Sequence, residues 1–320
     1  MLVWLINISL LSASGLAAAV GAILIPTLIK LGVKPAMAAS TVLLGTWGSS
    51  VSPGNPFIVQ VADLAQEDLM TIIQGFAPKA FICVIVSALV LYGIAMITKE
   101  GIMKETPAEE IAEEELEKTE KIKPHYAIVP LVPLILLIIS SKQVGLIPEV
   151  SVPLSMLVGV ALGFLVTLTD LQEVCRKFFQ GMGNAYADVI GLIVCASVFT
   201  AGMTAIGLTG ALTELMEGSQ AAAAAAGTFG PFFIAVISGS GDAAAFAFNG
   251  AITPFAEQFG LSIMDLGSLA QIAGAMGRSM SPIAGAAIIC AGLAKVNPIE
   301  VSKRNALPCL ASAIVLMLLL

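Results

Sequence analysis

Long apolar runs separated by short polar breaks dominate the 320-residue chain. Runs of roughly 20 residues, the length that crosses the hydrocarbon core as a helix, recur from end to end. In the second half, two apolar arms, Ala221 to Ile237 and Ala243 to Phe259, flank a polar tip, and a span from Leu266 to Gly292 is broken around Arg278 to Gly285. Non-helical backbone at membrane depth is tolerated only inside protein or beside a wet cavity. The pattern predicts an all-α membrane protein with re-entrant hairpins and broken spans.

The polar breaks of the second half repeat those of the first. Ser12 to Ala19 returns as Ser238 to Ala245, 226 positions on, and Gly48 to Pro53 returns as Gly277 to Pro282, 229 positions on. Interrupted apolar segments at corresponding positions of two halves point to the binding site of a transporter. Five predicted crossings separate the two hairpins, and an odd number turns the second copy upside down. We therefore expect an inverted-repeat secondary transporter with two re-entrant hairpins and two broken transmembrane helices.

The remaining elements follow from the same pattern. The first copy should contain a hairpin arm over Ala17 to Ile29, a span over Ala36 to Val61 broken around Ser49 to Pro56, and a plain span over Phe76 to Ile97. Between the copies we expect spans over Tyr126 to Ser141 and Val152 to Leu168, an amphipathic stretch over Asp170 to Gln180, and an irregular span over Ala187 to Leu215; the last span is Ala306 to Leu320.

These elements predict four parts of the chain. They are the first-repeat part of a transport domain (1–98), an acidic linker (99–124), scaffold helices of the second repeat (125–216) and the second-repeat part of the transport domain (217–320). Nothing before residue 12 matches the block from Tyr126 to Ile237, so we expect the first repeat to be truncated at its amino end.

Composition and charge agree with a membrane location. The chain is 58% hydrophobic and 12% charged, too few polar residues to cover a soluble globule of this size. Tracing the path puts twelve of the 15 lysines and arginines on the side of the acidic linker, two on the other side and Arg278 within the membrane. Because short cytoplasmic loops carry the excess of positive charge, the linker should be cytoplasmic and the protein should span the bacterial cytoplasmic membrane.

Catalytic chemistry finds no support in the sequence. The five cysteines are scattered without paired spacing, and His125, the only histidine, ends the linker. No zinc-protease, nucleophile-elbow or phosphate-loop motif is present. We therefore expect neither an enzyme nor a bound metal or cofactor, and no nucleic-acid partner.

The breaks supply the candidate binding groups. A helix that ends in mid-membrane offers free amides to an anion, whereas freed carbonyls hold a sodium ion. Serines and glycines at the tips and breaks add hydroxyl donors and let the backbone approach a ligand. The alternative is that these small residues only permit close helix packing. Asn55, whose positional counterpart is Ala284, either binds substrate or satisfies the unwound backbone after Pro53.

Two charged residues stand at membrane depth, where each costs roughly 2.5–3.5 kcal/mol on insertion scales. They are Arg278 and Asp242, and their counterparts Ser49 and Leu16 are uncharged. One hypothesis is a structural ion pair between them. The other is that Arg278 meets a substrate carboxylate through its planar fork, while Asp242 binds a coupling cation or proton.

The segments GTWGSSVSPGNPF and ISGSGDAAAFAFNGAITPFAEQFGL resemble the DcuC-type family of four-carbon dicarboxylate transporters of anaerobic bacteria, within the ion transporter superfamily. The resemblance extends over essentially the whole chain. It implies a homodimer of elevator type, in which a transport domain slides across the membrane beside a fixed scaffold. It also implies the following binding positions: Ser14, Gly15, Ser50, Ser52, Ser240, Gly241, Ser279 and Ser281. The sodium-coupled members of the superfamily carry Ser-Asn-Thr at these tips and breaks, which this chain lacks.

Together these arguments predict a secondary active transporter of small dicarboxylates such as fumarate, succinate or malate, working by exchange or cation coupling. Asn55 and Arg278 join the binding positions; Asp242, Gly48 and Gly277 are the candidate ion-coupling positions, and Na⁺ and H⁺ are the candidate ions. The expected partners are the dicarboxylate, the lipid bilayer and a second copy of the chain. The alternatives are the same fold carrying citrate, an amino acid or a cation exchanged for protons, and an ion channel.

Overall fold

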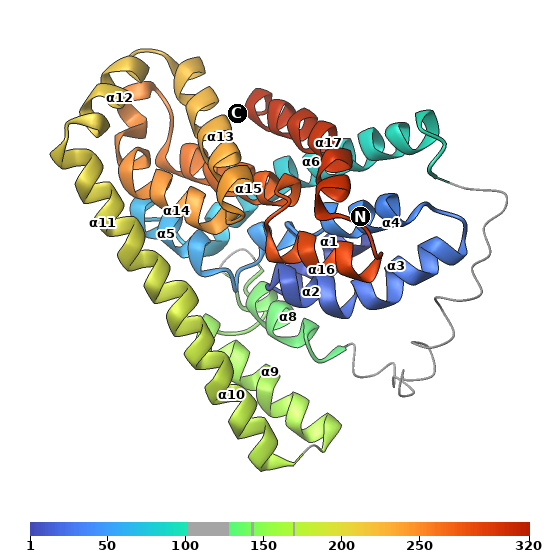
Figure 1. Ribbon diagram of the computed structural model, residues 1–320. Coiled ribbons are helices and arrows are strands. Elements are labelled where there is room, and N and C mark those ends of the chain that lie inside the picture. Colours follow the sequence, from blue (N-terminus) through green and yellow to red (C-terminus); the bar gives the residue numbers. More distant parts are fainter. Residues whose placement is uncertain (102–127, 142–143, 169) are drawn as a thin grey trace.

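The computed structural model describes residues 1–101, 128–141, 144–168 and 170–320. Within these ranges the chain is helices joined by turns, which confirms the all-α prediction (Figure 1). Among the described residues, four helical segments are long and apolar enough to cross a membrane, with α15 and α16 counted together as one, or up to six if two bent helix pairs each count as one span. Most of the predicted acidic linker, and His125, lie outside the described residues.

The first half follows the predicted order of hairpin arm, broken span and plain span. Its elements are α1 (Leu2–Ser9), α2 (Ala13–Ala19), α3 (Gly21–Lys30), α4 (Pro35–Leu44), the 3₁₀ turn η1 (Gly48–Val51), α5 (Pro56–Ala65) and α6 (Leu69–Ile97). Prolines at the first positions of α4 and α5 suit helix starts, where no intrahelical N–H bond is needed. The arm is bent by 49° between α2 and α3. The break between α4 and α5 lies where the sequence predicted it, because α4 ends at Leu44 and α5 begins at Pro56.

The middle of the chain forms two shorter apolar helices and a long arm. Its elements are α8 (Leu131–Ser140), α9 (Val152–Thr167), α10 (Leu171–Ala185), the π-helical turn η3 (Tyr186–Ile190), α11 (Gly191–Ala205) and α12 (Leu208–Met216). α8 packs against α9, and α10 to α11 run as one continuous helix along the edge of the molecule (Figure 1). The amphipathic stretch is longer than predicted, because the helix continues through Gly181 and Gly183 to Ala185.

The second half contains a helical hairpin, a broken span and a final span. Its elements are α13 (Gln220–Ser238), α14 (Gly241–Ala251), the 3₁₀ turn η4 (Thr253–Phe259), α15 (Ile263–Met280), α16 (Gly285–Leu293) and α17 (Pro298–Leu318). Serines cap three of these helices: Ser219, Ser240 and Ser262 each accept a hydrogen bond from a backbone N–H in the first turn. The last span starts eight residues earlier than predicted, because Asn297 caps α17 ahead of its polar first turn.

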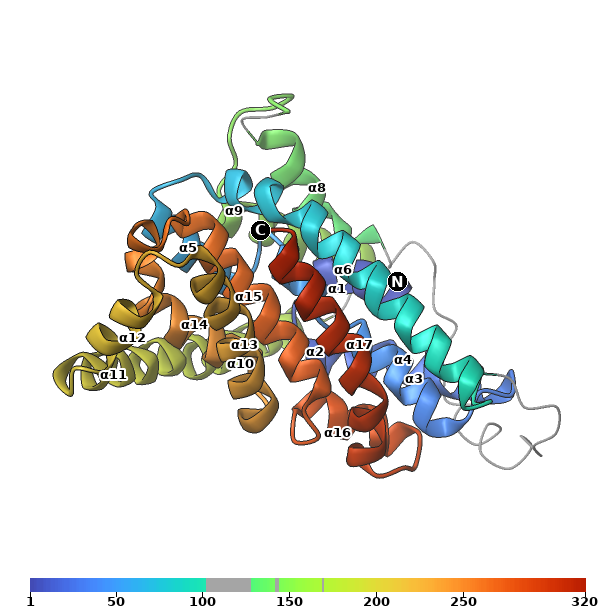
Figure 2. The same ribbon diagram turned by 90° about the horizontal axis from the view of Figure 1, so that it is seen from above.

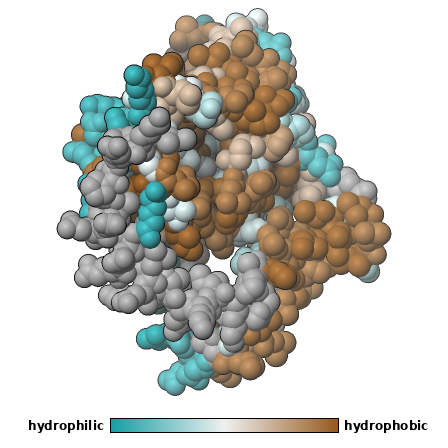
Figure 3. Space-filling model, turned by 90° about the vertical axis from the view of Figure 1, so that its right-hand side faces the viewer, coloured by the Kyte–Doolittle hydropathy of each residue, from teal (hydrophilic) through white to brown (hydrophobic). Residues whose placement is uncertain are grey.

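The two halves pack closely against each other. α6 and α17 lie side by side (Figure 2), and they exchange two hydrogen bonds: the Cys83 Sγ donates to the Ser312 carbonyl at 3.6 Å and the Ser312 Oγ donates to the Cys83 carbonyl at 2.9 Å. These two residues are 229 positions apart, the same spacing as the repeated breaks. Outside this contact, α6 presents large apolar side chains such as Leu89 and Tyr92 to its surroundings. Broad apolar areas occupy much of the coloured part of the face drawn in Figure 3, as expected of helices that contact lipid.

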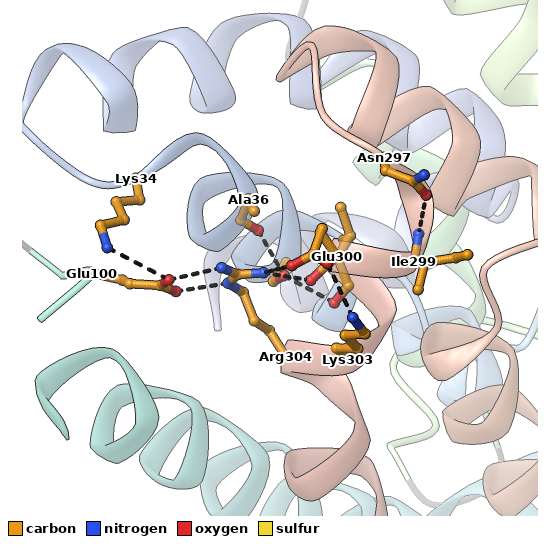
Figure 4. Close-up of polar contacts among 10 residues, drawn as sticks. Lys34, Ala36, Glu100, Asn297, Ile299, Glu300, Lys303 and Arg304 are labelled. Atoms are coloured by element: carbon orange, nitrogen blue, oxygen red, sulfur yellow. Dashed lines mark hydrogen bonds and ion pairs between the residues drawn. The ribbon is translucent and has the colours of Figure 1, made fainter. Parts of the chain in front are cut away.

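One end of the α6–α17 pair carries an ion-pair network around the buried carboxylate of Glu100 (Figure 4). Glu100, 8% exposed, receives the Arg304 guanidinium through two hydrogen bonds of 2.6 and 2.7 Å, and Lys34 lies 3.8 Å from its carboxylate. Arg304 also donates to the backbone carbonyl and carboxylate of Glu300. Hydrogen bonding to Arg304 holds the pKa of Glu100 below its ordinary value. The network joins the end of α6 to the starts of α4 and α17.

Candidate functional site

The two hairpin tips are built in the same way. Ser12 caps α2 by accepting the Gly15 N–H at 3.0 Å, and Ser240 caps α14 by accepting the Ala243 N–H at 3.2 Å. Each hydroxyl satisfies one amide of the first turn and leaves others free. Gly239, between α13 and α14, has a positive φ of 77°, which lets the chain reverse direction there. Both tips therefore present capped amino ends of helices.

Both tips reach the break between α15 and α16. A side chain added at Gly285, the first residue of α16, would lie 2.8 Å from the Ser14 Oγ. One added at Gly239 would lie 3.2 Å from the Ala284 backbone nitrogen. Two tips that are more than 200 positions apart in sequence thus meet at the adjacent residues Ala284 and Gly285. The amino ends of α14 and α16 converge there.

The first break is closed by hydrogen bonds from two asparagines. The Ser49 N–H donates to the Asn7 Oδ1 at 2.9 Å, and the Asn55 Nδ2 donates to the Ser49 carbonyl at 3.0 Å. Asn55 also caps α5 by accepting the Phe57 N–H at 2.9 Å. Of the two roles predicted for Asn55, the satisfaction of unwound backbone is therefore the one with described contacts. Ser50 and Ser52 are buried within this break.

The second break differs in how its serines are used. The Ser279 Oγ donates to the Ala275 carbonyl one turn back at 3.3 Å, and the Asn305 Nδ2 donates to the Ser279 carbonyl at 3.0 Å. The Ser281 Oγ is buried without a hydrogen-bond partner among the described residues. A buried hydroxyl in that state costs free energy unless water or a ligand completes it. Of the serines in this break, Ser281 is therefore the one whose hydroxyl is available to bind a ligand.

Arg278 and Asp242 are near enough to interact electrostatically, yet they form no direct ion pair in the described structure. The Arg278 Nη2 donates to the Thr46 carbonyl at 2.6 Å, a carbonyl just past the end of α4. Its Nε is buried and has no acceptor among the described residues. Asp242 instead accepts from the Gln271 Nε2 at 3.3 Å. The ion-pair hypothesis thus lacks a bond in this structure, and Arg278 keeps donors that are not used.

The tip of the second hairpin rests on α15 between these polar side chains. The backbone of Gly241 is so close to Gly274 that a Cβ at either position would collide with the carbonyl of the other. Gln271 lies one turn before Gly274 and Arg278 one turn after it, so all three share a face of α15. The arrangement sets Asp242 beside this face, with Gln271 as its described hydrogen-bond donor.

Gly48 and Gly277 occupy equivalent positions of close approach. A Cβ at Gly48 would collide with the Trp4 carbonyl of α1, and a Cβ at Gly277 would collide with the Phe232 carbonyl of α13. These glycines therefore have a packing role, and neither has a described contact with an ionisable group. Gly15, by contrast, is exposed on α2.

A cavity of about 390 Å³ lies between the first break and the α8–α9 pair. Ser52 and Gly54 line it on one side and Pro133, Met156 and Gly159 on the other. Its volume is in the range of small-molecule sites. Of the predicted binding residues, only Ser52 lines it. The described hydrogen bonds of Ser50 and Ser52 stay within the first break. The two tips are therefore joined more closely to the second break than to the first break.

Four residues at this centre were missed by the sequence analysis: Asn7, Thr46, Gln271 and Asn305. Asn7, Gln271 and Asn305 are polar side chains inside apolar runs, and all are buried. Polar residues at membrane depth are expected to be functional or paired. That signal, applied to amides as well as to charges, would have found these three. Thr46 contributes a backbone carbonyl, which no side-chain pattern reports.

Comparison with known proteins shows which transporters this chain is similar to. The family model described as DcuC, C4-dicarboxylate anaerobic carrier, matches residues 1–320. A protein of Haemophilus influenzae named only as an uncharacterized transporter is 38% identical over 263 residues, which cover 80% of this chain and 94% of that protein. The anaerobic C4-dicarboxylate transporter DcuC of Escherichia coli K12 is 26% identical over 324 residues, which cover 97% of this chain and 68% of that protein.

These relatives are transporters, which confirms that the chain is not an enzyme, and together with the apolar helices they make it a multi-pass membrane protein. The match along the whole chain, to a family whose name agrees with the resemblance seen in the breaks, identifies the protein as a member of the DcuC family of C4-dicarboxylate carriers.

Proposed function

We propose that this protein carries small C4-dicarboxylates such as fumarate, succinate or malate across the bacterial cytoplasmic membrane by alternating access. The family model and the Escherichia coli relative support this cargo. Exchange of one dicarboxylate for another and coupling to a cation are the two modes proposed. The acidic linker then lies on the cytoplasmic side.

The observation that carries the proposal is the convergence of both hairpin tips on the second break. The amino ends of α14 and α16 meet near Gly239 and Ala284, where helix dipoles and free amides favour negative charge. Arg278 adds a guanidinium with an unused donor on the adjoining turn of α15. A dianion needs both kinds of group, because each of its carboxylates loses water on binding.

Repeated contacts support an inverted-repeat mechanism. Cys83 and Ser312 bond reciprocally at the spacing of the repeat, and Gly48 and Gly277 make equivalent close approaches to neighbouring helices. In such carriers two related halves exchange access to a midplane site. We propose an elevator-type motion, in which the hairpins and broken spans move as a transport domain past a scaffold that includes α8 and α9, within a homodimer.

The cavity beside the first break supports a division between a moving part and a scaffold. It lies between Ser52 on the proposed moving part and α8–α9 on the proposed scaffold. The proposed binding residues are Ser14, Gly15, Ser50, Ser52, Asn55, Ser240, Gly241, Arg278, Ser279 and Ser281. Asp242 is proposed to take a proton or Na⁺, with Gly48 and Gly277 at the neighbouring coupling positions.

Counterflow of radiolabelled succinate into proteoliposomes loaded with unlabelled succinate tests the proposal. A carrier gives transient accumulation of label that depends on the internal substrate, whereas a channel gives none. Competition by fumarate and malate, without competition by citrate or amino acids, is expected for the proposed cargo. Absence of counterflow with every dicarboxylate would contradict the proposal.

A further inference from the structure

Two buried asparagines on neighbouring helices form hydrogen bonds with the backbone of the two broken spans. Asn7 lies on α1 and Asn305 on α17, and both have fully buried side chains. Neither belongs to a hairpin tip or to a break. An unwound segment lacks the regular hydrogen bonds of a helix, so its peptide groups need partners from elsewhere. These amides are such partners.

Asn7 links the first break to the first hairpin tip. Its Oδ1 accepts the Ser49 N–H at 2.9 Å, and its Nδ2 donates to the Leu10 carbonyl at 2.7 Å, two residues before the capping Ser12. One side chain thus fixes the orientation of the Ser49 peptide and the start of the tip together. With Asn55 bonded to the Ser49 carbonyl, both polar groups of this residue are held by amides.

Asn305 makes the corresponding hydrogen bond at the second break. Its Nδ2 donates to the Ser279 carbonyl at 3.0 Å, while its Oδ1 has no donor among the described residues although it is fully buried. The hydroxyls of Ser50 and Ser279 donate to backbone carbonyls of their own segments. The direction in which each break presents its remaining peptide groups therefore depends on the amide that holds it.

We propose that Asn7 and Asn305 are positioning residues that orient the unwound peptides of the two breaks for the transported anion. The proposal rests on the proposed function, and it predicts an effect on substrate affinity that exceeds the effect on stability. Misplacement of preorganised donors weakens an anion's binding even when the fold survives.

The chain offers a matched control in Asn249. This amide is also fully buried and makes two bonds: its Nδ2 donates to the Gly267 carbonyl at 3.2 Å and its Oδ1 accepts from the Thr253 hydroxyl at 2.9 Å. It joins α14 to α15 far from either break in sequence. Asn249→Leu therefore removes a buried amide without releasing a break.

The test compares Asn7→Leu, Asn305→Leu and Asn249→Leu in succinate counterflow. We expect the KM to rise about tenfold in the first two, a loss of about 1.4 kcal/mol of substrate binding, with a smaller change in maximal rate. Asn249→Leu should lower the unfolding temperature but leave the KM unchanged. An unchanged KM in Asn7→Leu and Asn305→Leu, or an equal rise in all three variants, overturns the proposal.

Amide hydrogen exchange gives a readout that does not depend on transport. Exchange should become faster at 48–55 in Asn7→Leu and at 279–284 in Asn305→Leu, and at neither in Asn249→Leu. If a leucine variant fails to fold, the alanine variant replaces it, since alanine also removes the hydrogen-bonding groups and adds no bulk. Unchanged protection of both breaks in the variants contradicts the proposal about Asn7 and Asn305, whether or not the protein transports succinate. Absence of counterflow in the unaltered protein counts against the proposed function alone.

Discussion

Arg278 illustrates how a single polar residue at membrane depth is both paired and available. Its Nη2 is used by the Thr46 carbonyl, while its Nε has no acceptor among the described residues. The first contact stabilises the buried charge, and the second leaves a directed donor. A guanidinium is suited to this double use because its donors lie in one plane and point in different directions.

Arg278→Lys should raise the KM for succinate at least tenfold. An ammonium group can keep one bond to the Thr46 carbonyl, but it has no second donor in the same plane to meet a carboxylate. Counterflow over a range of succinate concentrations measures the effect. Arg176→Lys on the exposed helix α10 is the matched control, and equal KM values for the two variants would count against a role of Arg278 in binding.

Asp242→Asn separates substrate exchange from ion coupling. The carboxamide still accepts from Gln271, so the tip should remain in place, but the charge proposed to hold a cation or proton is removed. Succinate counterflow should persist, while accumulation driven by a Na⁺ or proton gradient should be lost. Exposed Asp63→Asn is the control, and gradient-driven accumulation that survives in Asp242→Asn would exclude this residue from coupling.

At the scale of elements, close backbone packing and an ion-pair network hold the broken spans in place. Gly277 brings α15 against α13, and Gly48 brings the first break against α1. The Glu100–Arg304 pair fixes the end of α6 to α17. These contacts lie outside the tips, so they affect the stability of the frame more than the chemistry of the site.

Gly277→Ala should destabilise the protein by about 1–3 kcal/mol, because the new methyl group meets the Phe232 carbonyl and the helices must separate. Thermal unfolding in detergent measures the change. Gly93→Ala on α6 is the control, since a methyl group there meets nothing within 4 Å and alanine favours a helix. Equal unfolding temperatures for both variants would show that the close approach is not required.

Glu100→Gln should destabilise the protein at pH 7 by about 2 kcal/mol, because the partly buried Arg304 loses the closer of its two carboxylate partners and keeps only Glu300. The pKa of Glu100 is lowered in the folded protein, so its stabilisation is present above the ordinary glutamate pKa of about 4.3 and is lost as the pH falls through the lowered value.

The difference in unfolding temperature between the unaltered protein and Glu100→Gln should therefore shrink as the pH is lowered below about 4. Glu173→Gln, which breaks an exposed pair with Lys177, is the control and should have a smaller effect at pH 7. A Glu100→Gln difference that does not shrink as the pH is lowered further below about 4 would contradict the assignment to this carboxylate.

At the scale of the whole molecule, the sequence predicted the helical architecture and both broken spans, because apolar length and Ser/Gly/Pro interruptions report directly on them. Apolar periodicity does not report which breaks touch. The contacts of Ser14 with Gly285 and of Arg278 with Thr46 depend on packing between segments more than 200 positions apart. The partner of Arg278 was missed for the same reason, since it is a backbone carbonyl in the other half.

The central claim is that tips and breaks from both halves form one substrate site. Ser14 and Gly285 test it most directly, because a Cβ added at Gly285 lies 3.9 Å from the Ser14 Cβ, within the range for a disulfide. In a Ser14→Cys, Gly285→Cys protein whose exposed Cys175 and Cys195 are replaced by serine, oxidation should form this bond. We expect succinate to slow the reaction, and the bond to stop counterflow until it is reduced. Failure of the bond to form, or counterflow that continues while it is intact, would contradict a shared site.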